Sequence, residues 1–387
     1  MATLNIYGKD LLKGLSYIAP AVGTKTTSKQ ENTLVYFAVD PNEDKAILQV
    51  QSTMFIASTN IEYDAVNSDE KLEALIDYNS LHNYVRNNSK ASLFEFDFSK
   101  VKEDILILNI GSKFIGEMAT FPLDAYELES FENNTELTTI TANKFKRMID
   151  MGCQFANTKQ DTQDYMQLIG EEDRLIFFTS DTDVVAKFSS DESLEDNFNI
   201  TVKASALRGI KSFEQDIIEL SQDSEGYYLI IKENAGFRAV ALHSDPPQTY
   251  EELEEETNSY DYSLSWAIEE MQQALRNLES SSSNGKLYFN LMNDYTLKVY
   301  SNTLSASSTK IELNAVVDNF DTDLAKEDYT CDIGLFRKLG NVAKKSGKVN
   351  LDFSLNEDDP KDKYIQFMEA TGTEHEVDYN IIFGVVD

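Results

Sequence analysis

The chain has 387 residues, 41% of them hydrophobic, which is enough for two or three domains that each bury a core. Gly (16) and Pro (6) are scarce while Phe (22) and Tyr (19) are frequent, which excludes collagen-like and wholly disordered chains. The net charge of −33 repels nucleic acid and anionic membranes unless the 34 Lys and Arg are segregated.

Neither an export signal nor a membrane span is visible in the sequence. The N-terminal region lacks a basic-then-apolar signal, and no apolar run is long enough to cross a bilayer. Cys153 and Cys331 are too few for a disulfide framework, and each falls in a predicted helix as a small buried residue. We therefore expect a cytoplasmic protein that does not associate with membranes.

Helical periodicity recurs six times along the chain. Apolar residues spaced i, i+3/i+4, i+7 predict helices over 8–22, 78–90, 141–153, 203–213, 262–279 and 331–348. The starts of these helices lie 59 to 70 residues apart. Such a period predicts a repeated structural unit that is longer than most solenoid repeats.

Short alternating, β-branched or aromatic runs fill the interval after each predicted helix. In chain order they predict strands over 34–39, 46–52, 54–65, 93–98, 105–110, 114–121, 165–169, 175–179, 184–188, 217–220, 227–232, 237–242, 286–291, 296–300, 310–314, 349–354, 364–370 and 379–386. One helix followed by three or four antiparallel strands, six times over, predicts an α+β fold.

Two polar segments divide the six units into pairs. The first is 130–135, and the second is 244–259, which contains Pro246, Pro247 and a run of glutamates. The run itself is typical of a solvated loop. We expect three similar domains over 1–132, 133–250 and 257–387, each built from two helix-plus-sheet units.

Positive charge is concentrated in the predicted helices. The six segments hold 16 of the 34 Lys and Arg but only 6 of the 67 Asp and Glu. The fifth helix departs from this pattern, because Glu269 and Glu270 oppose a single Arg276. Lys and Arg also favour ordinary solvated helix faces, so one helix alone would mean little.

A basic surface on an acidic body fits one polyanion, held in a channel. Without a stacking or recognition-helix motif, these side chains would contact phosphates and read no bases. The candidate DNA-binding residues are Lys9, Lys13, Arg86, Lys144, Arg147, Lys203, Arg208, Lys211, Lys338 and Lys345.

Three stretches carry a family resemblance. TELTTITANKFKRMIDMGCQFANTKQDTQDYMQLI, residues 135–169, resembles the start of the middle domain of bacterial DNA polymerase sliding clamps, the polymerase β subunits. It has the same order of strand, helix with a KR pair, polar loop and QD-x-x-x-Y. VALHSDPPQTYEEL resembles that family's segment before its third domain, and GKLYFNLMNDYTLKVYSN resembles its third-domain hairpin.

The resemblance implies three similar domains per chain, with two chains closing head to tail into a ring around duplex DNA. It implies a non-enzymatic homodimer that tethers a DNA polymerase and is opened by a clamp loader. Carried over residue by residue, the family's partner-peptide pocket would comprise Val185, Pro247, Leu335, Ile381 and Phe383. The chain ends in IIFGVVD instead of the family's usual Pro-containing strand and basic tail. Together with the acidity, this departure suggests a phage-encoded clamp.

Two other function classes remain open. LIFFTSDTDVVAKF places Asp181 and Asp183 after an apolar strand, as in magnesium-dependent phosphatases of the haloacid dehalogenase type, although a hairpin turn explains both aspartates equally well. An acidic DNA mimic or structural phage protein is the third class. The segment 374–378 matches no established metal-ligand spacing, and no phosphate-binding glycine loop is present. We therefore expect neither a metal nor a cofactor.

Overall fold

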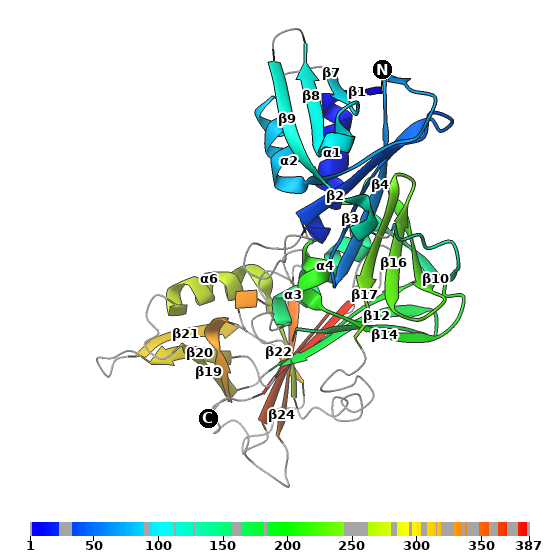
Figure 1. The fold of residues 1–387 in the computed structure, drawn as a ribbon. Coiled ribbons are helices and arrows are strands. Elements are labelled where there is room, and N and C mark those ends of the chain that lie inside the picture. The colour runs from blue at the N-terminus through cyan, green and yellow to red at the C-terminus, as the bar shows by residue number, and fades with distance from the viewer. Residues whose placement is uncertain are drawn as a thin grey trace. The chain divides into compact units, whose positions relative to one another are not determined.

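The computed structural model describes residues 2–22, 33–88, 93–111, 114–126, 128–156, 164–181, 184–243, 262–279, 285–293, 296–302, 308–314, 316–318, 329–334, 337–338, 348–355, 363–369 and 378–384. The chain divides into two compact units (Figure 1). The first comprises Met1–Ala142 with Ala206–Leu242, and the second comprises Asn143–Ser205 with His243–Asp387.

Each repeat begins with a strand that leads directly into a helix. These pairs are β1 (Thr3–Tyr7) with α1 (Gly8–Ile18), β6 (Leu72–Asp77) with α2 (Tyr78–Asn87), β10 (Asn134–Thr141) with α3 (Ala142–Phe155), β14 (Phe198–Val202) with α4 (Ala204–Arg208), and β18 (Tyr262–Ala267) with α6 (Ile268–Glu279). In the sixth repeat, β23 (Tyr329–Asp332) leads into helical residues at 333–334 and 337–338.

Three strands follow the helix in every repeat. They are β2 (Leu34–Val39), β3 (Lys45–Gln51) and β4 (Phe55–Glu62); β7 (Leu93–Asp97), β8 (Ile105–Ile110) and β9 (Phe114–Phe121); β11 (Met166–Glu171), β12 (Arg174–Asp181) and β13 (Val184–Asp191); β15 (Ile217–Asp223), β16 (Tyr228–Glu233) and β17 (Gly236–Ala241); β19 (Lys286–Asn293), β20 (Thr296–Asn302) and β21 (Ser308–Asn314); β24 (Lys348–Leu355), β25 (Lys363–Glu369) and β26 (Asp378–Gly384). Short strands β5 (Ala65–Asn67) and β22 (Val316–Asp318) are additional. The predicted α+β class is confirmed.

Three of the predicted helices needed correction. The fourth ends at Arg208, because Gly209 follows and the chain then turns toward β15. The predicted fifth helix starts six residues too early, since Tyr262–Ala267 is a strand that pairs with β24. The sixth prediction likewise included the end of β23 at its start and the first residue of β24 at its end.

Consecutive repeats exchange their first strands. In the first two repeats β1 pairs with β7, while β6 pairs with β2. The third and fourth repeats do the same, with β10 on β15 and β14 on β11, and so do the fifth and sixth, with β18 on β24 and β23 on β19. Each repeat therefore completes the sheet of its neighbour.

The last strands of four repeats join sheets from different pairs. β4 pairs antiparallel with β17 in the first unit, and β13 pairs antiparallel with β26 in the second. The last strands of the second and fifth repeats are β9 and β21. Along Phe114–Ala119 the outer edge of β9 pairs with no described strand, and β21 ends its four-stranded sheet. We call β4·β17 and β13·β26 the internal joints.

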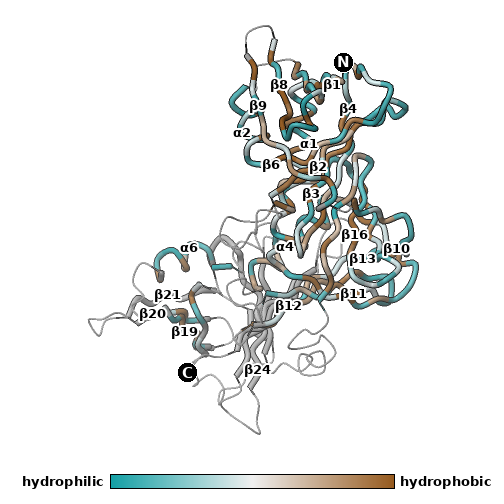
Figure 2. Tube along the Cα trace, viewed as in Figure 1, coloured by the Kyte–Doolittle hydropathy of each residue, from teal (hydrophilic) through white to brown (hydrophobic). Residues whose placement is uncertain are grey.

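The helices cover one face of these sheets. In α1, Leu11, Leu15 and Ile18 are fully buried, while Gly14 lies so close to the sheet that an added Cβ would contact Ile61 and Leu48. In the second unit, Phe145 of α3 packs edge-on against a ring of β12 with centroids 5.5 Å apart. Figure 2 shows the apolar residues concentrated along the strands and the inner sides of the helices.

The first expected linker is partly a packed segment. Within it, Phe131 packs edge-on against Tyr228 and Phe237 at 5.4 and 5.1 Å, and shortly before it Tyr126 stacks on Tyr36 with ring centroids 5.7 Å apart. These rings cover the sheet face opposite the helices. β10 already begins at residue 134, whereas the second expected linker, 244–259, lies outside the described residues.

Candidate nucleic-acid interface

Helix α1 presents a narrow polar stripe to solvent. Its buried residues recur with helical spacing, which leaves Lys9, Lys13 and Ser16 exposed at i, i+4 and i+7. The Lys9 ammonium lies 6.0 Å from the centre of the Tyr7 ring. The stripe can therefore offer ammonium donors to an extended anion, whereas the Ser16 hydroxyl already donates to the Leu12 carbonyl over 2.8 Å.

Helix α2 packs against α1 and carries a second polar stripe. Tyr78 donates from its hydroxyl to the Leu15 carbonyl over 3.1 Å, which fixes the two helices to each other. Asn79, Asn83 and Arg86 are exposed at i, i+4 and i+7. Amides and a guanidinium at this spacing are donors that suit phosphate oxygens.

The last residue of α4 and the segment after it add two more cations to the first unit. Arg208 and Lys211 are exposed, and the Lys211 ammonium donates to the Arg208 carbonyl over 3.3 Å. Gly209 lies against Pro20, directly after α1, so closely that a Cβ added to the glycine would stand 3.2 Å from the proline Cβ. The first unit thus brings five of the candidate cations onto adjoining elements: Lys9, Lys13, Arg86, Arg208 and Lys211.

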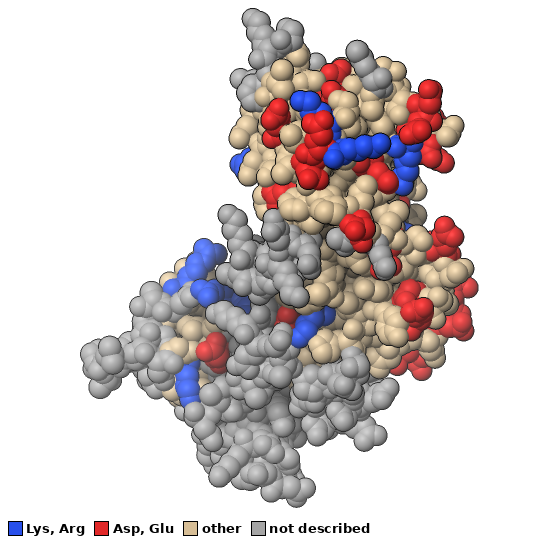
Figure 3. Space-filling model, viewed as in Figure 1, with Lys and Arg blue, Asp and Glu red and all other residues tan. Residues whose placement is uncertain are grey.

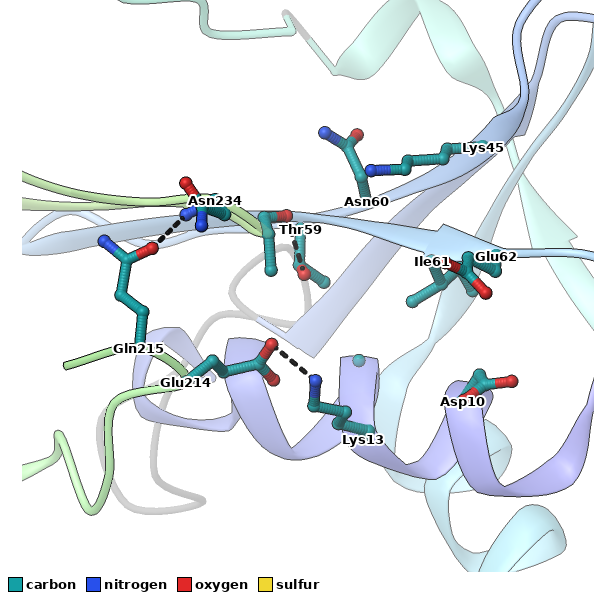
Figure 4. Close-up of a pocket in the computed structure, with 12 residues that line it drawn as sticks. Asp10, Lys13, Lys45, Thr59, Asn60, Ile61, Glu62, Glu214, Gln215 and Asn234 are labelled. Atoms are coloured by element: carbon teal, nitrogen blue, oxygen red, sulfur yellow. Dashed lines mark hydrogen bonds and ion pairs between the residues drawn. The ribbon is translucent and has the colours of Figure 1, made fainter. Parts of the chain in front are cut away.

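One of these cations has a carboxylate partner that the sequence did not reveal. Lys13 Nζ lies 2.8 Å from Glu214 Oε2, across 201 residues of sequence (Figure 4). The hydrogen bond to Glu214 raises the pKa of Lys13. The pair forms one wall of a polar cavity of about 340 Å³, which Lys45, Asn60 and Asn234 also line.

Helix α3 corrects one candidate. Lys144 is only 9% exposed and its ammonium lies 2.6 Å from Glu192 Oε1, so it is a buried structural pair and not a surface cation. Its ammonium also donates to the Asp191 carbonyl. Arg147, half-buried on the same helix, remains a candidate, whereas the neighbouring Lys146 pairs with Asp150.

The other candidates in the second unit are less exposed. Lys203 is half-buried immediately before α4. Lys338 is half-buried, with its ammonium 5.9 Å from the centre of the Phe155 ring. Lys345 lies outside the described residues.

Figure 3 shows basic and acidic side chains close together on the displayed face of the N-terminal elements, so segregation of charge there is incomplete.

Three residues of the expected partner pocket lie on the paired strands β13 and β26. Val185 is half-buried against a cluster of Ile169, Ile176 and Phe178. In the register of β13 with β26, Val185 stands opposite Ile382, whereas Ile381 and Phe383 stand opposite Ala186 and Val184. Pro247 and Leu335 lie outside the described residues.

The strand topology does not suit the phosphatase alternative. β12 and β13 form an antiparallel hairpin in which Asp181 stands opposite Val184. Phosphatases of that type need a strand of an α/β sheet that leads into a loop and a helical crossover. Asp183 lies outside the described residues. Among the residues that the structure describes, no group of three or more His, Cys, Asp or Glu could hold a metal, and no helix is long and apolar enough to span a membrane.

Comparison with known proteins identifies the fold. No protein-family model and no curated protein sequence matches the chain. Solved structures match over its whole length. The DNA polymerase III β subunit of Thermotoga maritima has a TM-score of 0.81 at 10% identity, with all of both chains covered. A putative β subunit from Eubacterium rectale has a TM-score of 0.83 at 13% identity, also with all of both chains covered.

A third match has the same extent. The DNA polymerase III β subunit of Pseudomonas aeruginosa has a TM-score of 0.82 at 14% identity, with 99% of each chain covered. The chain described here therefore has, from end to end, the fold of the bacterial DNA polymerase III β subunits, the sliding clamps.

Proposed function

We propose that this protein is a DNA sliding clamp: a homodimeric ring that encircles duplex DNA, reads no sequence and tethers a replicative DNA polymerase in the cytoplasm. It would be opened by a clamp loader and would catalyse no reaction itself. The full-length clamp fold supports this role, and the reciprocal strand exchange supports three domains per chain.

The proposal of a ring depends on one observation: the last strand of one repeat pairs with the last strand of another. Two such pairs already form the internal joints, β4·β17 and β13·β26. The same rule, applied to the two last strands whose outer edges pair with no described strand, joins β9 of one chain to β21 of a second. Two chains would then close on each other through two equal, head-to-tail contacts.

An exposed apolar side chain on β9 supports the proposal that a second chain covers the outer edge of this strand. Ile115 is 72% exposed, the most exposed of the large hydrophobic side chains in the described residues. A strand edge with an exposed isoleucine is a site where another strand adds readily. Burying it against β21 of a second chain would remove both the backbone groups of this edge and the apolar surface from water.

Contact with DNA is proposed through four exposed cations of the first unit and the half-buried Arg147 of α3. Lys9, Arg86, Arg147, Arg208 and Lys211 would touch phosphates individually and weakly, because the acidic body opposes the duplex. Retention would then depend on encirclement. The polymerase would be tethered at the β13 face that carries Val185, the described member of the expected pocket.

A threading experiment tests encirclement without a loader. The protein is mixed with linear duplex DNA that carries biotin at both ends, and streptavidin is then added to block the ends. We expect protein to stay with this DNA through a moderate-salt wash and to leave after one internal cut. Two outcomes would show ordinary binding instead of encirclement. One is equal retention when streptavidin blocks the ends before the protein is added, and the other is equal retention on the DNA after it has been cut.

A further inference from the structure

The ion pair between Lys13 and Glu214 differs from an ordinary surface pair in how its two sides are held. The Lys13 side chain is 63% exposed, whereas the Glu214 side chain is 17% exposed. The acid is thus largely fixed in the protein while the ammonium reaches solvent. Figure 4 shows Lys13 extending from α1 to meet Glu214, which comes from the segment that follows α4.

A buried network holds Glu214 in place. Its backbone N–H donates to Glu233 Oε2 over 2.6 Å. The other carboxylate oxygen of Glu233 accepts from Arg238 Nη1 over 2.7 Å, and both of these side chains are almost fully buried. Buried hydrogen-bonded charges are costly to rearrange, so the backbone at Glu214 is held where its carboxylate lies 2.8 Å from Lys13 Nζ.

A lysine held in this way contributes little net charge to a bound polyanion. An ammonium paired with a carboxylate forms a neutral unit, so a phosphate gains less from contacting it and displaces fewer counterions. The partner acid therefore sets how strongly this part of α1 attracts DNA. In a protein that must move along the duplex, weaker individual contacts allow faster movement.

We propose that Glu214 is an attenuator of DNA contact: it neutralises Lys13 on the DNA-facing surface and so keeps the affinity of the clamp for phosphate low. This inference rests on the proposed clamp function and adds to it a residue that regulates the same surface. Glu214 is a positioning residue, because it acts on DNA through Lys13.

The test is Glu214→Gln, which keeps the side-chain volume and leaves the backbone hydrogen bond to Glu233 in place. The affinity for a short linear duplex is measured by fluorescence anisotropy between about 50 and 200 mM salt, concentrations at which phosphate contacts dominate. We expect a severalfold higher affinity in the variant and a salt dependence steeper by about 0.9, the slope of one added phosphate contact on B-DNA. Thermal unfolding of the variant checks that the fold is retained.

Two controls separate the local effect from the change of net charge. Glu43→Gln, in an exposed turn of the same unit, raises the net charge equally and should leave the salt slope unchanged. The double variant Lys13→Gln/Glu214→Gln should lose the gain, as expected if the two residues are coupled. A gain that persists in the double variant would overturn the proposal.

Failure of this inference differs from failure of the clamp function. If the wild type is trapped on end-blocked DNA and Glu214→Gln leaves its salt slope unchanged, the attenuator is excluded and the clamp stands. If the wild type is never trapped on end-blocked DNA, the clamp function itself is excluded, and Glu214 has no sliding surface on which to act.

Discussion

The guanidinium carbon of Arg238 lies 3.8 Å from the centre of the Tyr17 ring, deep inside the first unit. Arg238 belongs to β17 in the fourth repeat, and Tyr17 belongs to α1 in the first. A buried charge is tolerated there because the ring face, the Glu233 carboxylate and the Tyr17 carbonyl all surround the guanidinium. The contact fixes α1 to the internal joint β4·β17.

Breaking this cluster should cost stability. Arg238→Met leaves the Glu233 carboxylate buried without its cation, so we expect the free energy of unfolding in urea to fall by about 3 kcal/mol. Adding Glu233→Gln removes the uncompensated charge and should restore part of the loss. Equal stability of the single and double variants would show that the carboxylate is not the source of the cost.

The outer edge of β9 predicts a variant that cannot dimerise. Ile115→Glu places a charge on the strand proposed to pair with β21, and light scattering should give half the mass of the wild type. Ile217→Glu is the matched control, because Ile217 is 61% exposed but lies on β15, which pairs on both sides. If Ile115→Glu keeps the mass of the wild type, β9 is not the interface.

Two cations of helix α3 should behave in opposite ways. Lys144→Gln breaks a buried ion pair and should lower the free energy of unfolding by about 3 kcal/mol, with little effect on DNA binding by the folded protein. Arg147→Gln should leave stability nearly unchanged and reduce the salt slope of DNA binding by about 0.9. Urea unfolding and anisotropy titrations on both variants distinguish the two roles.

The stability of the fold should depend on pH through His82, and the direction of its pKa shift determines the sign. Burial, together with the nearby Arg86, lowers the pKa of His82 below its usual 6.5. Between pH 6.5 and that lower pKa, the unfolded chain binds more protons than the folded chain, so acid weakens the fold. His82→Gln removes this contribution. Its stability relative to the wild type should rise as the pH falls from about 7.5 to about 5, and a constant difference would contradict the assignment.

Regular patterns of apolar residues were enough to predict most of the elements. β2, β8 and β9 begin and end at the predicted residues, because their flanking turns carry polar residues and glycine. The strand before each helix was missed by periodicity, since it joins the helix without a turn. Tyr262–Ala267 was merged with α6 for this reason, and only its pairing with β24 reveals the boundary.

The exposure of a candidate cation could be predicted only where the pattern of its own helix determines it. Lys9 and Arg86 lie opposite their own helix's buried stripe, so the pattern of a single element places them in solvent. The availability of Lys144 and Lys13 for DNA depends on their ion pairs with Glu192 and Glu214, which lie 48 and 201 residues away in the sequence. Pairing across such distances is set by the packed fold, and no local pattern reports it.

The internal joints β4·β17 and β13·β26 are made chiefly by main-chain hydrogen bonds, which any residue except proline can supply. Specificity at such a joint comes from strand length and from which face is apolar, and many different side chains meet both conditions. Mutation can therefore replace many residues along these strands without separating them, although Gly236 is an exception because an added Cβ would collide with the Ser58 carbonyl oxygen. The amino-acid sequence is therefore only weakly constrained at these joints, which fits a fold that the chain shares with solved structures of very low sequence identity.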